Sequence, residues 1–235
     1  MLKNNLISIV IPTYEMLGNG LFFLELSLKK ILQQTYKNIE VVISDHSVDS
    51  KIEELILVYS DKLNIKYFKN NNNRGSSSAN LNNGIINSSG SIIKILMQDD
   101  YLYEKTAIEN IFNTFNQNEN IIWLVTGCVY GNKNGLVRGN MFPTYTEDII
   151  VGNNKIGSPS VLTIKNENPI LFNNELIWMM DCDYYKRLFD NYGKPFVLME
   201  HQVYITQHQH QLTSLLSFER KNKEVELIKN TYNLC

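Results

Sequence analysis

The sequence predicts an α/β fold, with one domain built around a mostly parallel sheet that is flanked by helices. Short apolar runs rich in β-branched residues alternate with amphipathic helical segments over the first hundred residues. The helical segments are long enough to carry the chain from one parallel strand to the next. The 235 residues, of which 43% are hydrophobic and 20% charged, are sufficient for one sizeable core and argue against disorder.

Four strands and three helices are expected in this first part. Apolar, β-branched runs predict strands at 6–12, 39–44 and 91–97, and an alternating pattern predicts one at 64–70. The helices lie between them, at 21–34, 48–60 and 77–88. The first strand is bounded by Pro12. The first helix has the leucine spacing of an amphipathic helix that packs on a sheet, at positions Leu21, Leu24, Leu28 and Leu32.

After Tyr101 the regular alternation stops. A helix around 104–117 and the apolar stretch 121–131 are followed by turns rich in Gly, Asn and Pro. A compact helix at 181–191 and a last helical stretch at roughly 214–230 complete the chain. Because no linker or repeat separates these segments, one domain with an open α/β half and a more irregular second half is expected.

Charge, cysteine content and missing motifs argue against several classes of protein. The net charge of −2 provides no general attraction for nucleic acid. Three scattered cysteines, Cys128, Cys182 and Cys235, argue against a zinc site or a disulfide framework and fit a reducing cytoplasm. No apolar run is long enough to span a membrane. Neither a P-loop motif nor a complete GxGxxG motif occurs.

Polar and aromatic side chains follow three of the predicted strands. Tyr14 follows the first strand, Asp45 the second, and the adjacent carboxylates Asp99 and Asp100 the fourth. Taken singly, each has an ordinary explanation as a core ring, a turn or cap residue, or part of a solvated loop. Ligands of open parallel sheets bind beyond the carboxyl ends of the strands, so the three together favour one binding crevice.

The two adjacent carboxylates need a positive partner. Their charges repel each other, and the repulsion grows beside an apolar core. A divalent cation, Mg²⁺ or Mn²⁺, would neutralise Asp99 and Asp100 and would also bridge to phosphate oxygens. The ring of Tyr14 and the carboxylate of Asp45 suit a nucleobase. The residues alone therefore point to a nucleoside diphosphate bound together with a metal ion.

Several segments, taken in order, resemble one known family. They are "ISIVIPTYE", "IEVVISDHSVD", "NRGSSSANLNNGI", "GSIIKILMQDD", "IGSPSVLTIKN", "ELIWMMDCDYYKRL" and "HQHQLTS". The pattern is similar to that of the family 2 inverting glycosyltransferases and covers almost the whole chain. The resemblance implies the GT-A fold, a Rossmann-like, mostly parallel sheet flanked by helices, with an irregular acceptor-binding half.

The resemblance also implies which residues bind the nucleotide. Pro12 and Tyr14 match positions that line the nucleobase pocket. Asp45 matches the carboxylate that accepts a hydrogen bond from the base ring. Asp99 matches the residue near the ribose of the donor. Gln98 stands where the family's DXD motif usually has its first Asp.

A metal ligand and a general base are implied in the same way. Asp100 matches the metal-binding residue of the DXD motif. His208 matches a late His that faces the diphosphate or the metal, with His210 as a nearby alternative. Asp181 matches the general base, and Met180 stands where the family carries a Glu. From the residues alone, Asp181 could equally be the N-cap of a predicted helix.

Taken as a whole, the resemblance implies a metal-dependent inverting glycosyltransferase of the hexosyltransferase type, with Mn²⁺ or Mg²⁺ as its cofactor. It would move a sugar from a nucleoside diphosphate sugar, with a UDP-sugar expected, to a hydroxyl of a glycan or lipid-linked acceptor in surface polysaccharide synthesis. Residues 1–103 would form the nucleotide-sugar-binding half, 104–213 the acceptor and catalytic half, and 214–235 a C-terminal helix. The expected location is the cytoplasm, including the inner face of the membrane.

Two other functions stay open at this point. A non-catalytic nucleotide-sugar-binding module would keep Tyr14 and Asp45 but would not need Asp100 and Asp181 together. A glycoside hydrolase also needs two carboxylates, but it has no use for a nucleobase pocket.

Overall fold

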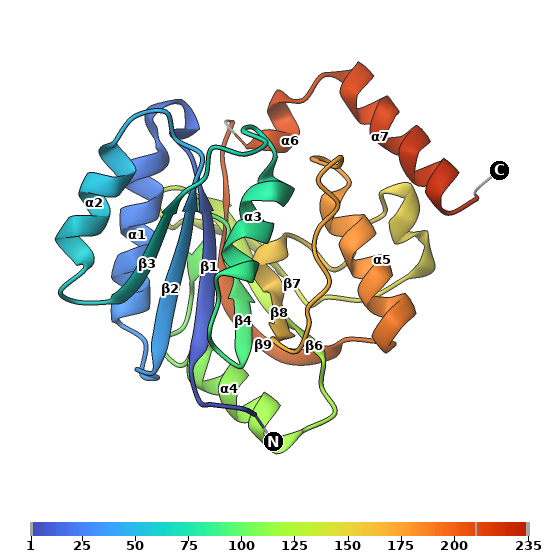
Figure 1. The fold of residues 1–235 in the computed structure, drawn as a ribbon. Coiled ribbons are helices and arrows are strands. Elements are labelled where there is room, and N and C mark those ends of the chain that lie inside the picture. The colour runs from blue at the N-terminus through green and yellow to red at the C-terminus, as the bar shows by residue number, and fades with distance from the viewer. Residues whose placement is uncertain (1, 210, 234–235) are drawn as a thin grey trace.

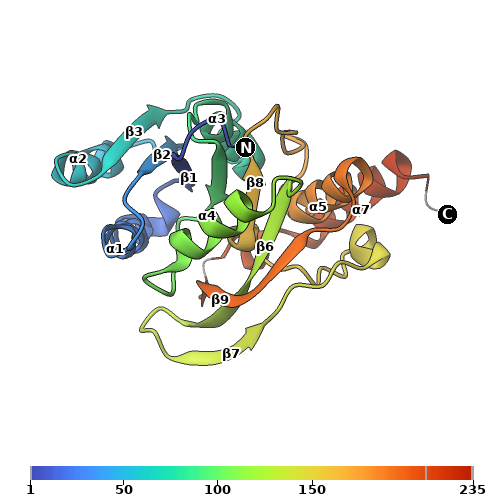
Figure 2. The same cartoon turned by 90° about the horizontal axis from the view of Figure 1, so that it is seen from below.

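The computed structural model describes residues 2–209 and 211–233. Within these residues the strands belong to one nine-stranded sheet. Helices cover both faces of the sheet, which curls in its second half (Figures 1 and 2). The predicted α/β fold class is therefore confirmed. No helix in the described part of the chain is both long and apolar enough to cross a membrane.

The four strands predicted in the first part of the chain form the parallel half of the sheet. They are β1 (Ile7–Thr13), β2 (Ile39–Asp45), β3 (Asn64–Lys69) and β4 (Ile92–Ile95), in the spatial order β3-β2-β1-β4. β1 continues one residue beyond the predicted boundary, because Pro12 stays in register opposite Ser44. The fixed φ of proline is compatible with a strand end, where only one ladder hydrogen bond is lost.

Three helices connect these strands and place the binding edge. They are α1 (Gly20–Leu32), α2 (Lys51–Tyr59) and α3 (Ser77–Ile86). α1 and α2 cover one face of the sheet and α3 covers the other (Figure 2). The chain adds β2 and β3 on one side of β1 and then crosses over to add β4 on the other side, so the order of strand addition reverses between β1 and β4. At such a switch point the loops after neighbouring strands diverge and leave a crevice at the carboxyl edge.

The second half of the sheet is mixed, and most of its strands were not predicted. It contains β5 (Tyr101–Leu102), β6 (Trp123–Asn132), β7 (Val137–Met141), β8 (Leu162–Lys165) and β9 (Phe196–Gln207). β8 is antiparallel to both β4 and β6, whereas β6 and β9 run parallel. β6 corresponds to the apolar stretch seen in the sequence. β7 forms a local hairpin with β6, whereas β5, β8 and β9 pair across long sequence separations, which local patterns do not reveal.

The remaining helices complete the fold. They are α4 (Ala107–Gln117), α5 (Met180–Tyr192), α6 (Leu212–Leu215) and α7 (Phe218–Thr231), with 3-10 segments η1 (Met16–Gly18), η2 (Glu147–Val151) and η3 (Pro159–Val161). The predicted last helical stretch is in fact two helices. Ser217 separates them because its side chain caps α7, accepting a hydrogen bond from the Arg220 N–H at 3.2 Å. The predicted boundary at residue 103 falls between β5 and α4, and the functional division of the chain into halves stays a prediction.

Candidate active site

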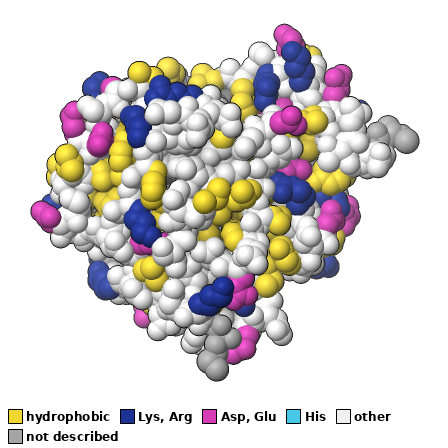
Figure 3. All heavy atoms as spheres, viewed as in Figure 1, with side chains coloured by type: hydrophobic (Ala, Val, Ile, Leu, Met, Phe, Trp, Pro, Cys, Tyr) yellow, Lys and Arg dark blue, Asp and Glu magenta, His cyan; other side chains and the backbone are white. Residues whose placement is uncertain are grey.

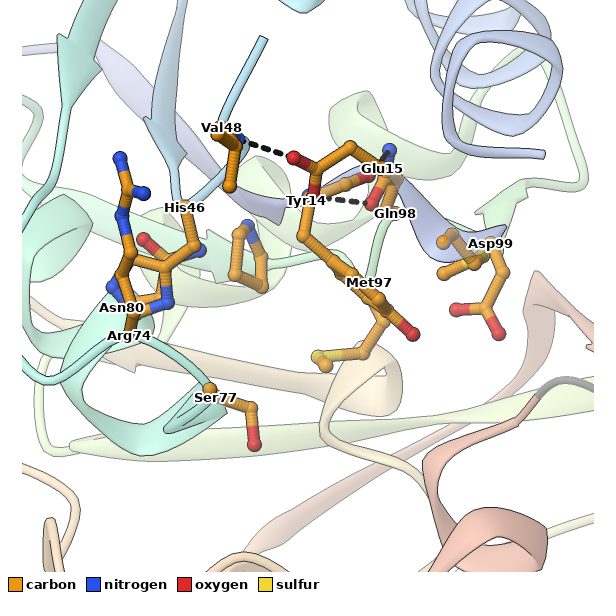
Figure 4. A pocket seen from close by; sticks show the side chains of 13 residues that line it. Tyr14, Glu15, His46, Val48, Arg74, Ser77, Asn80, Met97, Gln98 and Asp99 are labelled. Carbon is orange, nitrogen blue, oxygen red and sulfur yellow. Dashed lines mark hydrogen bonds between the residues drawn. The ribbon is translucent and has the colours of Figure 1, made fainter. Parts of the chain in front are cut away.

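A cavity of about 310 Å³ lies at the carboxyl edge of the parallel strands, at the switch point. The loops after β1, β2 and β4 and the start of α3 all contribute to its lining. Arg74 and His46 lie on one side of it, and Tyr14, Met97 and Asp99 on the other (Figure 4). The predicted nucleotide residues Pro12, Tyr14 and Asp99 are thus brought together around one cavity.

Gln98 holds the loop that carries Tyr14. Its Oε1 accepts the Tyr14 N–H at 3.0 Å, and its Nε2 donates to the Tyr14 carbonyl at 3.1 Å and to the Gly20 carbonyl at 2.9 Å. One amide therefore pairs with both main-chain groups of Tyr14 as a neighbouring strand would. An Asp could not do this, because a carboxylate has no donor. A Cβ on Gly20 would lie 2.3 Å from the Tyr14 carbonyl oxygen, so the close approach requires glycine.

The adjacent carboxylates Asp99 and Asp100 point to different surroundings. Asp100 is 3% exposed. Its Oδ2 accepts from the Ser160 hydroxyl at 2.5 Å and the Ser158 hydroxyl at 3.3 Å, and its Oδ1 accepts from the Thr206 N–H at 3.0 Å. Burial and the neighbouring charge of Asp99 raise the pKa of Asp100 well above its usual range, although these hydrogen bonds oppose the shift.

Lys94 is a positive group near Asp100. It is 0% exposed in the middle of β4, and its ammonium donates to the carbonyls of Ser160 and Leu162. Burial lowers the pKa of Lys94 to about 7, while the charge of Asp100 acts in the opposite direction. The ammonium of Lys94 is thus bonded to main-chain carbonyls and not to the Asp100 carboxylate.

Asp99 instead faces His208. The Nε2 atom of His208 lies 2.9 Å from Oδ2 of Asp99, and the His208 ring stacks on Phe23 with a centroid distance of 4.8 Å. The resemblance implies His208 and Asp100 as metal ligands, whereas the structure places the His208 imidazole against Asp99. The alternative residue, His210, lies outside the described residues. Asp99 lines the cavity (Figure 4), whereas Asp100 lines only the cavity that adjoins it.

The fit of a divalent cation can be judged from these donors. Among the described residues no three His, Cys, Asp or Glu side chains converge as a complete metal site. One carboxylate and one imidazole do meet at 2.9 Å. That separation resembles the spacing of adjacent ligands around an octahedral ion with bonds of about 2.1 Å. Asp99 and His208 therefore fit a cation whose remaining ligands come from phosphate oxygens and water.

Asp45 does not face the cavity as the resemblance implies. Its side chain is fully buried, and its two oxygens accept from Thr13, the Ser47 N–H, Tyr67 and Lys69 at 2.8–3.1 Å. Burial alone would raise its pKa, but the hydrogen bonds from Ser47, Tyr67 and Lys69 more than offset this and hold the pKa of Asp45 below its usual value. With four donors in place, the carboxylate supports the wall of the cavity from behind.

A second cavity of about 220 Å³ adjoins the first. The two share the residues Tyr14, Met16, Ser77, Met97 and Asp99. The other walls of the second cavity include Ser158, Trp178 and Asp181. The carboxylate expected to act as a base thus lines a space that opens next to the predicted nucleotide site. Charged side chains lie mostly toward the edge of this face of the molecule (Figure 3).

Asp181 is held in place but is not the cap of α5. The N-cap position is Met179, and Asp181 lies within the first turn. Its Oδ1 accepts the Cys182 N–H and its Oδ2 accepts from the Asn154 amide, both at 2.8 Å. Burial raises the pKa of Asp181, and these hydrogen bonds only partly oppose the shift. A carboxylate whose pKa is raised in this way accepts a proton more readily than a solvated one.

Two further lining residues had no role assigned from the sequence. Arg74 is held by the Asn71 side chain at 2.7 Å and the Ser47 carbonyl at 3.3 Å, and Glu15 accepts the Val48 N–H (Figure 4). Both are charged residues in polar loops, where a charge most often is simply solvated, so no local pattern distinguishes them.

Similar sequences are found among known proteins. The family described as Glycosyl transferase family 2 matches residues 8–189. An uncharacterized glycosyltransferase of Rickettsia bellii is 40% identical over 135 residues, which are 55% of this chain and 18% of that protein. A Campylobacter jejuni protein named GalNAc(5)-diNAcBac-PP-undecaprenol beta-1,3-glucosyltransferase is 31% identical over 97 residues, 41% of this chain and 30% of that protein. The chain spans only 18% to 33% of the length of the first curated relatives.

Solved structures show the same fold. TarS of S. aureus, residues 1–349 in complex with UDP-GlcNAc, superposes with a TM-score of 0.70 at 18% identity, over 95% of this chain and 65% of that one. Mannosyltransferase PcManGT from Pyrobaculum calidifontis, in complex with GDP-Man and Mn²⁺, superposes with a TM-score of 0.65 at 14% identity, over 97% and 64% of the two chains. At such identities the likeness concerns the fold alone.

Proposed function

The chain belongs to glycosyl transferase family 2, and on this premise we propose that it transfers a sugar from a nucleoside diphosphate sugar to a hydroxyl group, with inversion at the anomeric carbon. The observation that carries the proposal is that the two cavities share a wall. Tyr14 and Asp99 line both of them, and Asp181 lines the second. A donor in the first cavity would thus present its sugar toward a carboxylate able to act as a base.

For the donor we propose a UDP-sugar. Tyr14 offers a ring for stacking and Arg74 a donor for a ring carbonyl, both at the first cavity. The N3–H of uracil then needs an acceptor other than the buried Asp45. Glu15 also lines the cavity, and its Oε1 accepts a hydrogen bond from the Val48 N–H. The fold neighbours carry UDP-GlcNAc in one case and GDP-Man in another, so each base is compatible with this fold.

For the metal we propose a Mn²⁺ or Mg²⁺ ion held by Asp99 and His208, rather than by Asp100 and His208. Asp99 lines both cavities and lies 2.9 Å from the imidazole, whereas Asp100 is committed to two serines and a backbone N–H. When bound, a divalent cation supplies positive charge against the departing diphosphate. The Mn²⁺ in a fold neighbour is compatible with such a site.

We propose that Asp181 takes the proton of the acceptor hydroxyl as the hydroxyl attacks the anomeric carbon. The bond from that carbon to the diphosphate oxygen breaks in the same step, which inverts the configuration. Asn154 and the Cys182 N–H orient the carboxylate. General-base assistance of this kind contributes about 10²–10⁴ in rate. Asp100 also lines the second cavity, but its Oδ2 is bonded to the hydroxyls of Ser158 and Ser160.

For the acceptor we propose a glycan or a lipid-linked sugar used in surface polysaccharide synthesis, at the inner face of the membrane. Two observations support this proposal. The Campylobacter relative is named for a transfer onto an undecaprenol-linked saccharide. The second cavity is lined in part by apolar side chains, among them Ile177, Trp178 and Ile205, which suit the apolar faces of sugar rings.

The donor proposal is tested by titrating UDP, UDP-GlcNAc, GDP, GDP-mannose and ADP into the protein by calorimetry, with Mn²⁺ and with EDTA. We expect UDP and a UDP-sugar to bind most tightly, and more tightly with Mn²⁺. Release of UDP in the presence of an acceptor would then distinguish an enzyme from a binding module. Tighter binding of ADP or GDP than of UDP, or no binding of any nucleotide, would contradict the proposal.

A further inference from the structure

Glu224 is a buried carboxylate to which the proposed reaction gives no part. It lies on α7 and is 2% exposed. It also lies beyond residues 8–189, the part of the chain that matches the family. Burying a carboxylate is costly unless hydrogen bonds satisfy it, so donors must surround Glu224.

Three consecutive main-chain N–H groups donate to Glu224. Its Oε1 accepts from Ile177 at 3.0 Å, and its Oε2 accepts from Trp178 at 2.7 Å and from Met179 at 2.9 Å. These residues lead directly into α5, whose N-cap makes no side-chain capping bond of its own. Glu224 therefore satisfies donors at the start of α5 from another helix, near the positive end of the α5 dipole.

The same stretch of chain forms a wall of the second cavity. Ile177, Trp178, Met180 and Asp181 all line it. A single carboxylate on α7 thus fixes the backbone immediately before Asp181. If that backbone moved, the Asp181 carboxylate would move with it, and a displacement of about 1 Å at a reacting group can cost about 10²-fold in rate.

Two more contacts join α7 to this region. Arg220 donates from Nε to Oε1 of Glu224 at 2.9 Å and from Nη2 to the Glu175 carbonyl at 2.7 Å. Near the other end of the helix, the Tyr232 hydroxyl donates to Asp183 of α5 at 2.9 Å. In Figure 1, α7 lies above α5. These contacts are directional hydrogen bonds, so they fix the position of α5 relative to α7.

We propose that Glu224 is a positioning residue for the acceptor side of the site: by binding the three N–H groups before α5, it holds Asp181 where the acceptor hydroxyl must lose its proton. The consequence for catalysis rests on the proposed function of Asp181. The ordering of residues 177–179 does not, and it can be measured separately.

The test is Glu224→Gln, which keeps the shape of the side chain but turns an NH₂ group toward backbone donors. Ordering is read from acrylamide quenching of tryptophan fluorescence. The chain has two tryptophans, and Trp123 is 2% exposed whereas Trp178 is half-buried in the positioned segment. Trp178→Phe identifies the signal of Trp178. We expect quenching of Trp178 to rise by about twofold or more through local opening, and kcat to fall by about 10- to 100-fold.

The matched control is Glu219→Gln. It removes the same charge from the same helix, but Glu219 is exposed and pairs only locally with Lys223 at 2.8 Å. We expect this variant to match the wild type in quenching and in turnover. The affinity for UDP should stay unchanged in both variants, because no contact of Glu224 reaches the first cavity.

The outcomes separate the possibilities. Increased quenching with lowered kcat and intact UDP affinity supports the inference. Quenching and kcat equal to those of Glu219→Gln overturn it, and so does a parallel loss of UDP affinity, which would mark a general role in folding. If Glu224→Gln does not fold, Arg220→Met is measured instead, and the absence of any change in Trp178 quenching overturns the inference. Increased quenching in a protein whose wild type transfers no sugar would count against the proposed function alone.

Discussion

The Nε2 atom of His208 lies 2.9 Å from Oδ2 of Asp99, although 109 residues separate the two in sequence. The next residue, Asp100, is turned the other way, onto Ser158, Ser160 and the Thr206 N–H. Two adjacent carboxylates therefore have different surroundings. Asp99 lines both cavities, whereas Asp100 lines only the second and is bonded to groups of the protein.

Asp99→Asn should remove the effect of Mn²⁺ on UDP affinity. With EDTA, this variant should bind UDP up to about tenfold more tightly than the wild type does, because one negative charge near the diphosphate is gone. Asp100→Asn is the matched control and should keep the Mn²⁺ effect. Calorimetric titrations of all three proteins give the answer. Loss of the Mn²⁺ effect in Asp100→Asn alone would return the metal to Asp100.

Gln98→Glu should weaken donor binding without unfolding the protein. The Nε2 of Gln98 faces the carbonyls of Tyr14 and Gly20 at 3.1 and 2.9 Å, and a carboxylate there would repel both. The Tyr14 loop should shift, and the affinity for UDP should fall by about tenfold, the equivalent of one lost hydrogen bond. Unchanged UDP affinity in this variant would show that the loop is held by other contacts.

Asp45→Asn should destabilise the protein at neutral pH by about 2 kcal/mol, since hydrogen bonds to a buried charged group are lost. The pKa of Asp45 is depressed in the folded state. The ionised Asp45 therefore adds to the free energy of unfolding at pH values above its pKa in the unfolded chain, about 3.9. This contribution is lost as the pH falls through the lower pKa of the folded state. Urea unfolding of the variant and the wild type should show a stability difference that is larger at pH 7 than at acidic pH. Asp49→Asn, on the same loop but part-exposed, should show little change.

Some of this arrangement could be predicted from sequence, and the limits have physical reasons. Three of the first four strands are apolar runs and the third has an alternating pattern, so their positions and the binding edge followed from local pattern. The opposite orientations of Asp99 and Asp100 did not, because they depend on serines about 60 residues later and on β9, about 106 residues later. Asp45 was assigned to the nucleobase because Tyr67 and Lys69 could not be seen to enclose it.

Glu224 is a further case in which sequence alone was not enough. It is one acidic residue among many in a helix of mixed charge, and nothing in its neighbours marks it as buried. Only the packing of α7 beside α5 gives it a role. In contrast, Asp181 was identified by its place in a motif, although the sequence suggested an N-cap and the structure puts Met179 at that position.

The pH dependence of Asp181 gives a prediction with two readouts. Burial raises its pKa in the folded state. The rate should therefore fall with decreasing pH in a range above the usual Asp value of about 3.9, because the base must be ionised. A carboxyl group whose pKa is raised by folding stabilises the folded state at pH values below its pKa in the unfolded chain. This stabilisation is lost as the pH rises through the pKa of the folded state. As the pH rises through that value, Asp181→Asn should become more stable relative to the wild type. A loss of relative stability would contradict a raised pKa at Asp181.

The most direct test of the proposed transfer reaction is the turnover of Asp181→Asn. Asn fits the same space and can still accept the Cys182 N–H, but it cannot take a proton. With a UDP-sugar and a matched acceptor, kcat should fall by at least about 10²-fold, while the affinity for UDP stays at the wild-type value and the melting temperature does not fall below it. A kcat close to that of the wild type would remove Asp181 from the reaction and contradict the account.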